Sequence, residues 1–365
     1  MSSSTTKPKS TIKRTLLTVL QIMVTAGILV WFFHDPDKRA KMGHAIAHAK
    51  PIWLFAGFIC YGIVELLASG RWYLLMRVQG IKLAWWRLGA LFMLGIFFNM
   101  FMPGGTGGDV LKIVFLIKEI PGKKAKGMLA VLMDRLIGLL ALIMISGVIV
   151  AIRYDWLKTS PVAQRLTWAL GLILVSGLGG IIFSFAISGF GLAHKLPKRM
   201  PMRDTMIDLS VAYNAYARAW PASLVALVLS FGIHVASFSV FICAAHALNT
   251  SNAAGVPVTT GEILTVMPII LTLAALPMSV GGAGVREALF AMLLVPLCGV
   301  TQDAAVTLSL TGAALAAAWG LIGGLIFLIY RPSEHPKIVD AEQEVFELGH
   351  EIAEHADDKE PEDVK

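Results

Sequence analysis

The chain has 365 residues, of which 56% are hydrophobic and only 15% are charged, and its mean hydropathy is +0.71. Soluble domains are closer to roughly 45–50% apolar and about 25% charged, so this composition excludes a soluble globular protein. The net charge of +7 is unevenly distributed, because the segment after Pro332 holds 12 of the 24 acidic residues but only 3 of the 31 basic ones. The strongly basic remainder indicates contact with anionic lipid headgroups rather than with nucleic acid.

The cysteine and histidine spacings predict neither a metal site nor a cofactor. Cys60, Cys243 and Cys298 are dispersed in apolar stretches, and an odd set without CxxC spacing indicates neither a disulfide framework nor a zinc site. His44 and His48 have the i, i+4 spacing of metal ligands, but a third ligand is missing from their segment. We expect no metal and no cofactor.

Long apolar runs predict a series of membrane spans. A basic segment, residues 1–14, precedes an apolar run at 15–33 that lacks a cleavage site and is predicted to be an uncleaved span. Two broken apolar segments occur at 86–119 and 262–298, and an acidic tail, residues 333–365, ends the chain. By length and hydropathy, the further full spans are 51–70, 125–152, 163–187, 219–248 and 304–330.

The two broken segments have the same order of residues. Each is an apolar run followed by a proline (Pro103 or Pro277), a glycine cluster, and a new helix that opens with charged residues. A broken helix at membrane depth is tolerated only where the freed backbone groups are buried in protein or line a cavity. Such interruptions in corresponding positions of two halves indicate the binding site of a transporter.

Loop charges predict opposite orientations for these segments. The first has basic flanks at Arg87 and Lys118, and the stretch from Arg71 to Arg87 is counted as part of a basic loop. The loops 249–261 and 299–303 contain no Lys or Arg. Because basic loops remain in the cytoplasm, the first segment enters and leaves from the cytoplasm and the second from outside.

These assignments predict an all-α polytopic protein with an inverted-topology repeat. It has six full spans and two opposed re-entrant hairpins, about eight to ten membrane helices in all. The half-repeats are residues 15–157 and 158–332 of one membrane domain, 15–332. Both termini, including 1–14 and 333–365, are expected in the cytoplasm, and the membrane is expected to be the inner membrane of a prokaryote.

The polar residues of the broken segments and of the following span are the candidate site. Glycine-rich helix starts expose backbone N–H groups that favour an anion, and an arginine fork suits phosphate. A lipid-phosphate headgroup is therefore the expected ligand. The candidate binding residues are Asn99, Gly104, Gly105, Gly108, Asp109, Lys112, Asp134, Arg135, Gly281, Gly282, Gly284, Arg286 and Glu287.

A structural role for these charges remains an alternative. Neighbouring acids and bases can neutralise one another and hold helices together. Asp134 and Arg135 are adjacent and point in different directions, so each needs a partner elsewhere. For Glu65, which lies inside a span, a functional and a structural role both remain open. His234 is expected to be a hydrogen-bonded core residue.

Three ordered blocks carry a resemblance to a known family. They are Asn99 with Pro103-Gly104-Gly105 and Gly108-Asp109, then Asp134-Arg135 with Gly138-Leu139, then Pro277 with Gly281-Gly282, Gly284 and Arg286-Glu287. With these blocks the chain resembles the membrane region of lysylphosphatidylglycerol synthases, the flippase-like domain family, over about residues 12–332. The family usually has Arg at Lys112 and Glu at Asp134, and a lysine lacks the bidentate geometry of arginine.

This resemblance implies a lipid translocase. In bifunctional members the domain moves an aminoacylated phospholipid that a separate soluble domain synthesises, and the 33 residues after Pro332 leave no room for that domain. We therefore expect a transporter of a phospholipid or another lipid-phosphate, not a lysyltransferase. The alternatives are a polytopic transferase acting on a lipid-phosphate carrier, which the short outside loops disfavour, and an accessory subunit of a lipid enzyme, which the charges at membrane depth disfavour. A homo-oligomer remains open.

Overall fold

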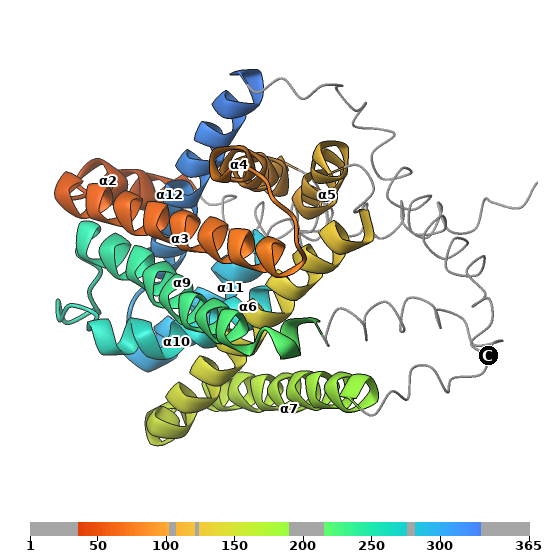
Figure 1. Ribbon diagram of the computed structural model, residues 1–365. Helices are drawn as coiled ribbons and strands as arrows, with labels where there is room; N and C mark the ends of the chain where they lie inside the picture. The colour runs from red at the N-terminus through yellow and green to blue at the C-terminus, as the bar shows by residue number, and fades with distance from the viewer. Residues whose placement is uncertain (1–35, 102–106, 121–123, 190–214, 276–281, 330–365) are drawn as a thin grey trace, which may run out of the picture.

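The computed structural model describes residues 36–101, 107–120, 124–189, 215–275 and 282–329 (Figure 1). These ranges are almost entirely helical, and the only β-contacts within them are isolated bridges in the connections before α10 and α12. The helices are α2 (Pro36–Ala47), α3 (Pro51–Val78), α4 (Trp85–Phe101), α5 (Gly107–Glu119), α6 (Lys124–Leu157), α7 (Pro161–Gly189), α9 (Trp220–Ala247), α10 (Thr260–Ala274), α11 (Val285–Cys298) and α12 (Gln302–Ile329).

Five of these helices, α3, α6, α7, α9 and α12, are long and apolar enough to cross a membrane. They coincide with five of the six predicted spans. The sixth, at 15–33, and both terminal segments lie outside the described residues. Much of the five helices is uncovered, and Ile152, Leu172 and Val175 are each more than 70% exposed. Exposed apolar side chains on this scale are expected where a helix faces lipid.

Each broken segment forms two short helices, as the proline and glycine pattern predicts. The first consists of α4 and α5 and the second of α10 and α11, and the two helices of each pair pack together. The residues between them, 102–106 and 276–281, lie outside the described ranges. Helices α4 and α5 approach closely, because a Cβ added to Gly108 would lie 2.0 Å from the carbonyl oxygen of Gly95.

Helices α3 and α9 form the centre of the packing and run antiparallel, side by side in Figure 1. At one end the backbone N–H of Lys50, just before α3, donates to the carbonyl of Ala247 at 2.8 Å. At the other end the hydroxyl of Tyr216, just before α9, donates to the carbonyl of Leu75 at 3.2 Å. The start of each helix therefore lies beside the end of the other.

The helix contacts repeat between the two halves. Helices α3, α4, α5 and α6 correspond in order to α9, α10, α11 and α12. Helix α4 packs on α12, and its counterpart α10 packs on α6. Helix α5 packs on α6, and its counterpart α11 packs on α12. Likewise α3 contacts α6 as α9 contacts α12, and α3 contacts α4 as α9 contacts α10. Exchanging the series α3–α6 with the series α9–α12 thus reproduces these contacts.

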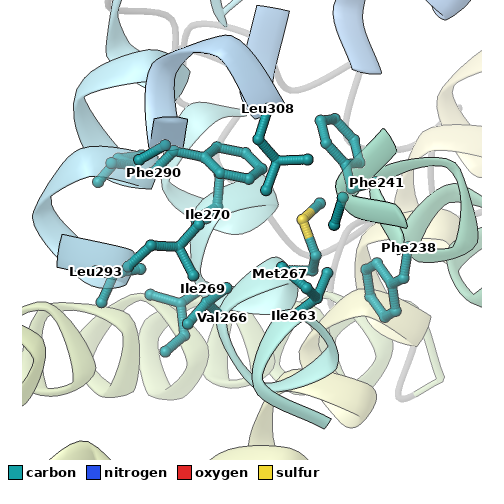
Figure 2. Packing of buried hydrophobic residues seen from close by; sticks show 14 of the residues in the cluster. Phe238, Phe241, Ile263, Val266, Met267, Ile269, Ile270, Phe290, Leu293 and Leu308 are labelled. Carbon is teal, nitrogen blue, oxygen red and sulfur yellow. The ribbon is translucent and has the colours of Figure 1, made fainter. Parts of the chain in front are cut away.

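The short helices lie within the apolar core. Helix α10 packs against α6, α7, α9 and α11. Figure 2 shows its apolar side chains among those of neighbouring helices, with the buried residues Phe238, Phe241, Ile263, Val266, Met267, Ile269, Ile270, Phe290, Leu293 and Leu308. In the first half, α4 presents Leu88, Leu91, Leu94 and Phe98 to a second core that includes Trp72 and Leu111. Burial in protein is the condition under which interrupted helices are tolerated at membrane depth.

Helix α2 is an element that the sequence pattern did not predict. It lies in the segment treated as the first loop and packs on α12. Its Met42 is 5% exposed and is buried together with Val306, against Ala288 and Ala291 of α11. The apolar side of this short helix therefore extends the core of the second half.

Candidate functional site

The start of α5 is capped by the preceding helix. The backbone N–H of Gly108 donates to Oδ1 of Asn99, on α4, at 3.0 Å. A Cβ at Gly108 would also lie 2.6 Å from the Asn99 side chain, so the contact requires glycine. The sequence predicted this N–H as an anion donor, but in the structure a protein side chain already occupies it.

Asp109 links the first broken segment to α6. Its Oδ2 forms an ion pair with Nη2 of Arg135. The Arg135 side chain is 57% exposed, whereas that of Asp109 is 13% exposed. The cation of this pair is therefore open to a ligand on one side.

Asp134 has a different partner, Arg71 on α3. Arg71 Nε donates to Asp134 Oδ1 at 2.8 Å, and its Nη1 donates to Ser230 Oγ on α9 at 2.7 Å. Both charged side chains are buried. The expectation that Asp134 and Arg135 each need a partner elsewhere is confirmed, and the Arg71 ion pair joins three helices.

The assignment of Arg71 to a basic loop was wrong. Helix α3 continues to Val78 because the apolar residues after Arg71 extend the span beyond residue 70. The unbroken stretch Trp72-Tyr73-Leu74-Leu75-Met76 was the signal that could have placed this arginine inside a helix. A buried arginine in a span needs an acidic partner, and Asp134 supplies it.

The structure explains why the sequence block that begins with Asp134-Arg135 has a glycine at position 138. A Cβ at this position would lie 2.9 Å from Nη1 of Arg71, so glycine leaves room for the guanidinium. The Gly138 carbonyl also accepts a hydrogen bond from His234 Nε2 at 3.0 Å. His234 is thus a hydrogen-bonded interior histidine, as expected.

Lys112 is only 4% exposed and lies between two aromatic rings. Its Nζ is 3.9 Å from the ring centroid of Trp72 and 4.4 Å from that of Phe92. A lysine ammonium over aromatic faces is a cation–π contact. Among the described residues no carboxylate forms an ion pair with Lys112, although the charges of Asp109 and Asp134 act on it at longer range.

Glu65 is a buried carboxylate on α3. The residue is 6% exposed, and Tyr61 precedes it by one helical turn on the same helix. The charge of Lys112, from the first broken segment, acts on Glu65. The charge of Arg286, from the second, acts on Tyr61. Of these two cations, only Lys112 acts on the carboxylate itself.

The start of α11 depends on glycine and on Glu287. Gly282 and Gly284 have φ values of +77° and +82°, in the region that only glycine adopts readily. The Gly284 N–H donates to Glu287 Oε2 at 2.5 Å, and the Glu287 side chain is 1% exposed. The carboxylate thus caps its own helix from the third position.

Arg286 is paired with its neighbour. Its Nη2 donates to Glu287 Oε1 at 2.8 Å, and its Nε contacts Ser309 Oγ on α12 at 3.2 Å. Ser309 in turn donates to Glu287 Oε1 at 3.0 Å. Adjacent residues pair here because the capping carboxylate turns back toward the helix start.

The candidate residues therefore form two groups. Asp109, Lys112, Asp134 and Arg135 lie around α5 and α6, and Arg286 and Glu287 lie at α11. Three candidates, Gly104, Gly105 and Gly281, fall outside the described residues. In the part of the chain that the structure describes, no cluster of three metal-ligating side chains occurs.

Comparison with known families agrees with the three sequence blocks. The family model described as the lysylphosphatidylglycerol synthase TM region matches residues 18–338. No curated protein gives a significant match to the chain. The match covers all the described helices and nearly the whole apolar part of the chain, so this multi-pass membrane protein belongs to the lysylphosphatidylglycerol synthase TM region family.

Proposed function

We propose that this protein transports a lipid between membrane leaflets and binds a phosphate-containing headgroup between its two broken segments. The observation that carries the proposal is the placement of cations at the helix openings inside an apolar protein. Arg135 lies against the opening of α5, Arg286 opens α11, and each is balanced by an acid. Charged residues at membrane depth are costly and by default mark a ligand path. Because they lie on membrane helices and not on an external loop, transport is favoured over group transfer.

The repeated helix contacts support this proposal. Corresponding helices α3 and α9 are antiparallel, and the packing of α3–α6 matches that of α9–α12. An inverted repeat with two opposed re-entrant hairpins would have this arrangement, and such repeats bind their substrates where the halves meet. In this proposal both termini lie in the cytoplasm and the membrane is the inner membrane.

Ligand exchange at Arg135 is energetically feasible. An ion pair at an exposed position contributes only about 0–1 kcal/mol, and the Arg135 side chain is 57% exposed. A phosphate can therefore replace Asp109 as its partner and gain the bidentate contact that arginine offers. Arg286 is 18% exposed and already bonded to Glu287 and Ser309, so it adds charge with less freedom to move.

Headgroup-resolved lipid translocation in proteoliposomes tests the proposal. We expect Arg286→Ala and Asp109→Asn each to reduce translocation at least about tenfold, corresponding to roughly 1.4 kcal/mol. Lys158→Ala is the control, because Lys158 pairs with Asp155 at an exposed position at the end of α6. Equal translocation by the wild type and both site variants would contradict the site. Failure to move any anionic or aminoacylated phospholipid would contradict the function.

The proposed topology has a separate test. Cysteines placed at Lys118, at the end of α5, and at Thr301, just before α12, should be labelled by an impermeant reagent from opposite sides of the membrane. The native Cys60, Cys243 and Cys298 are removed first. Labelling of both positions from the same side would rule out opposed hairpins.

A further inference from the structure

Basic side chains gather at one end of the helix bundle. Arg77, Lys82 and Arg87 lie where α3 ends and α4 begins, and all three are exposed. Arg87 Nη1 forms an ion pair with Glu119 Oε2 at 3.1 Å, so α5 ends beside the start of α4. Both outer ends of the first broken segment therefore lie at this end of the bundle, and Lys118 lies there with them.

The starts of α6 and α9 add two further cations to this end. A Cβ added to Gly127 of α6 would lie 2.8 Å from the side chain of Ile120, just after α5, so Lys126 lies beside the end of α5. The hydrogen bond from Tyr216 to the carbonyl of Leu75 places the start of α9, with the exposed Arg218, beside the end of α3. We call the cations at this end that form no ion pair with a described acid the basic face: Arg77, Lys82, Lys118, Lys126 and Arg218.

The helices that form the basic face do not balance its charge. Among the side chains described at this end, Glu119 is the only acid, and it is already bound to Arg87. At the other end of the bundle the helices carry acids of their own: Asp155 pairs with Lys158, and Glu262 and Asp303 lie at the starts of α10 and α12. A surface with charge of a single sign attracts a partner of the opposite sign, so the basic face suits an acidic partner.

Helix α12 ends on the same side as the basic face. Helices α3 and α12 run in the same direction, because Cβ atoms added to Gly57 and Gly62 would touch Leu315 and Trp319 in that order. The last turns of α12 therefore point toward the end of α3, and Figure 1 shows them beside α4. The acidic tail, residues 333–365, begins shortly after the end of α12 at Ile329. The chain thus starts its most acidic segment at the end of the bundle that lacks acids.

We propose that the acidic tail binds to the basic face of the same chain. The tail has 12 acidic and 3 basic residues. A tethered partner acts at an effective concentration on the order of millimolar for a short flexible linker, and an extended chain reaches about 3.3 Å per residue. Lipid headgroups meet the bundle at its rim, whereas Arg77 and Arg218 lie at the ends of α3 and α9, which form the centre of the packing. The bound tail connects α12 to both outer ends of the first broken segment, apart from the proposed headgroup site.

Tryptophan quenching of a fluorophore on the tail tests this contact in the full-length chain. Trp85 and Trp86 are 69% and 58% exposed and lie at the start of α4, among the cations. The native cysteines are removed, and bimane, which tryptophan quenches at short range, is attached to the variant Ala341→Cys in an uncharged detergent. Its fluorescence should rise at least about twofold when salt is raised to 1 M, because the Debye length falls to roughly 3 Å. Trp85→Phe with Trp86→Phe should remove this change without altering any charge.

Charge reversal identifies the surface that the tail contacts. Lys82→Glu with Lys126→Glu should leave the fluorophore bright at low and high salt, because both exposed cations of the basic face are reversed. Lys50→Glu with Arg165→Glu is the matched control. It changes the net charge equally at two exposed positions, but at the other end of the bundle, where α3 and α7 begin. This control should be quenched as the wild type is.

Reversal of the tail completes the test. Adding Glu342→Lys and Glu344→Lys to Lys82→Glu with Lys126→Glu should restore quenching, since attraction between the two surfaces returns with opposite signs. In nanodiscs the salt-dependent quenching should persist with phosphatidylcholine alone and with phosphatidylglycerol added. Loss of quenching only with phosphatidylglycerol would assign the basic face to anionic lipid and overturn the proposal. Quenching in the wild type that does not respond to salt, or equal quenching in the wild type and in Lys82→Glu with Lys126→Glu, would overturn it as well and leave lipid transport standing.

Discussion

In the first broken segment the carboxylate of Asp109 is balanced by Arg135 on the following long helix, whereas in the second the carboxylate of Glu287 is balanced by its own neighbour, Arg286. The exposures differ as well. The Arg135 side chain is 57% exposed and that of Arg286 is 18% exposed. Of the two carboxylates, Asp109 is 13% exposed and Glu287 is 1% exposed. Glu287 also accepts hydrogen bonds from the Gly284 N–H and from Ser309. The second segment thus has a self-contained polar cluster, and the first depends on other helices.

This difference indicates that the two broken segments have different roles although they share the same order of residues. A buried carboxylate with several donors is a rigid part of the framework, because removing any donor leaves an unsatisfied charge. An open ion pair exchanges partners at little cost. The comparison predicts that charge changes at Glu287, and at the buried Arg71–Asp134 pair, act mainly on stability. Charge changes at Asp109 and Arg135 should act mainly on transport.

The largest expected effect comes from the buried pair behind the first segment. Asp134→Ala leaves the Arg71 guanidinium buried without a counter-charge, and breaking such a pair costs about 3–5 kcal/mol. Thermal unfolding in detergent should show a strongly reduced midpoint. The double variant Arg71→Met with Asp134→Ala should recover much of this loss, because the unpaired charge is gone. If the double variant were no more stable than Asp134→Ala, the unpaired charge would not be the cause.

Much of the helix pattern could be predicted from the sequence, and the partners of the charges could not. The ends of α4 at Phe101 and of α10 at Ala274, shortly before Pro103 and Pro277 in the sequence, follow from local backbone chemistry, since proline ends a helix and glycine clusters do not continue one. Arg71 was missed because span ends are set by hydropathy averages, which do not register one charge that is neutralised by a distant helix. The cage that Trp72 and Phe92 form around Lys112 joins three helices and has no local signal. Three of the predicted glycines lie outside the described residues and stay predictions.

A smaller effect is expected where α4 and α5 touch. Gly108→Ala places a Cβ 2.0 Å from the Gly95 carbonyl oxygen, so the two helices must separate. Overpacking of this kind costs about 1–3 kcal/mol, and the cap from Asn99 is weakened with it. Gly179→Ala on α7 is the matched control, because nothing lies within 4 Å of its added Cβ. Equal midpoints for the two variants in thermal unfolding would mean that the close approach of α4 and α5 is not needed for stability.

The smallest effect on stability is expected at Arg135, and this variant tests the comparison directly. Arg135→Ala should lower the free energy of unfolding by no more than about 1 kcal/mol, because the pair with Asp109 is open to its surroundings. Its lipid translocation should nevertheless fall at least as far as that of Asp109→Asn. Arg135→Lys keeps the charge but not the bidentate fork, so it should restore translocation only in part. A loss of stability as large as that of Asp134→Ala would instead make Arg135 a structural cation, and mutual neutralisation would then describe both broken segments.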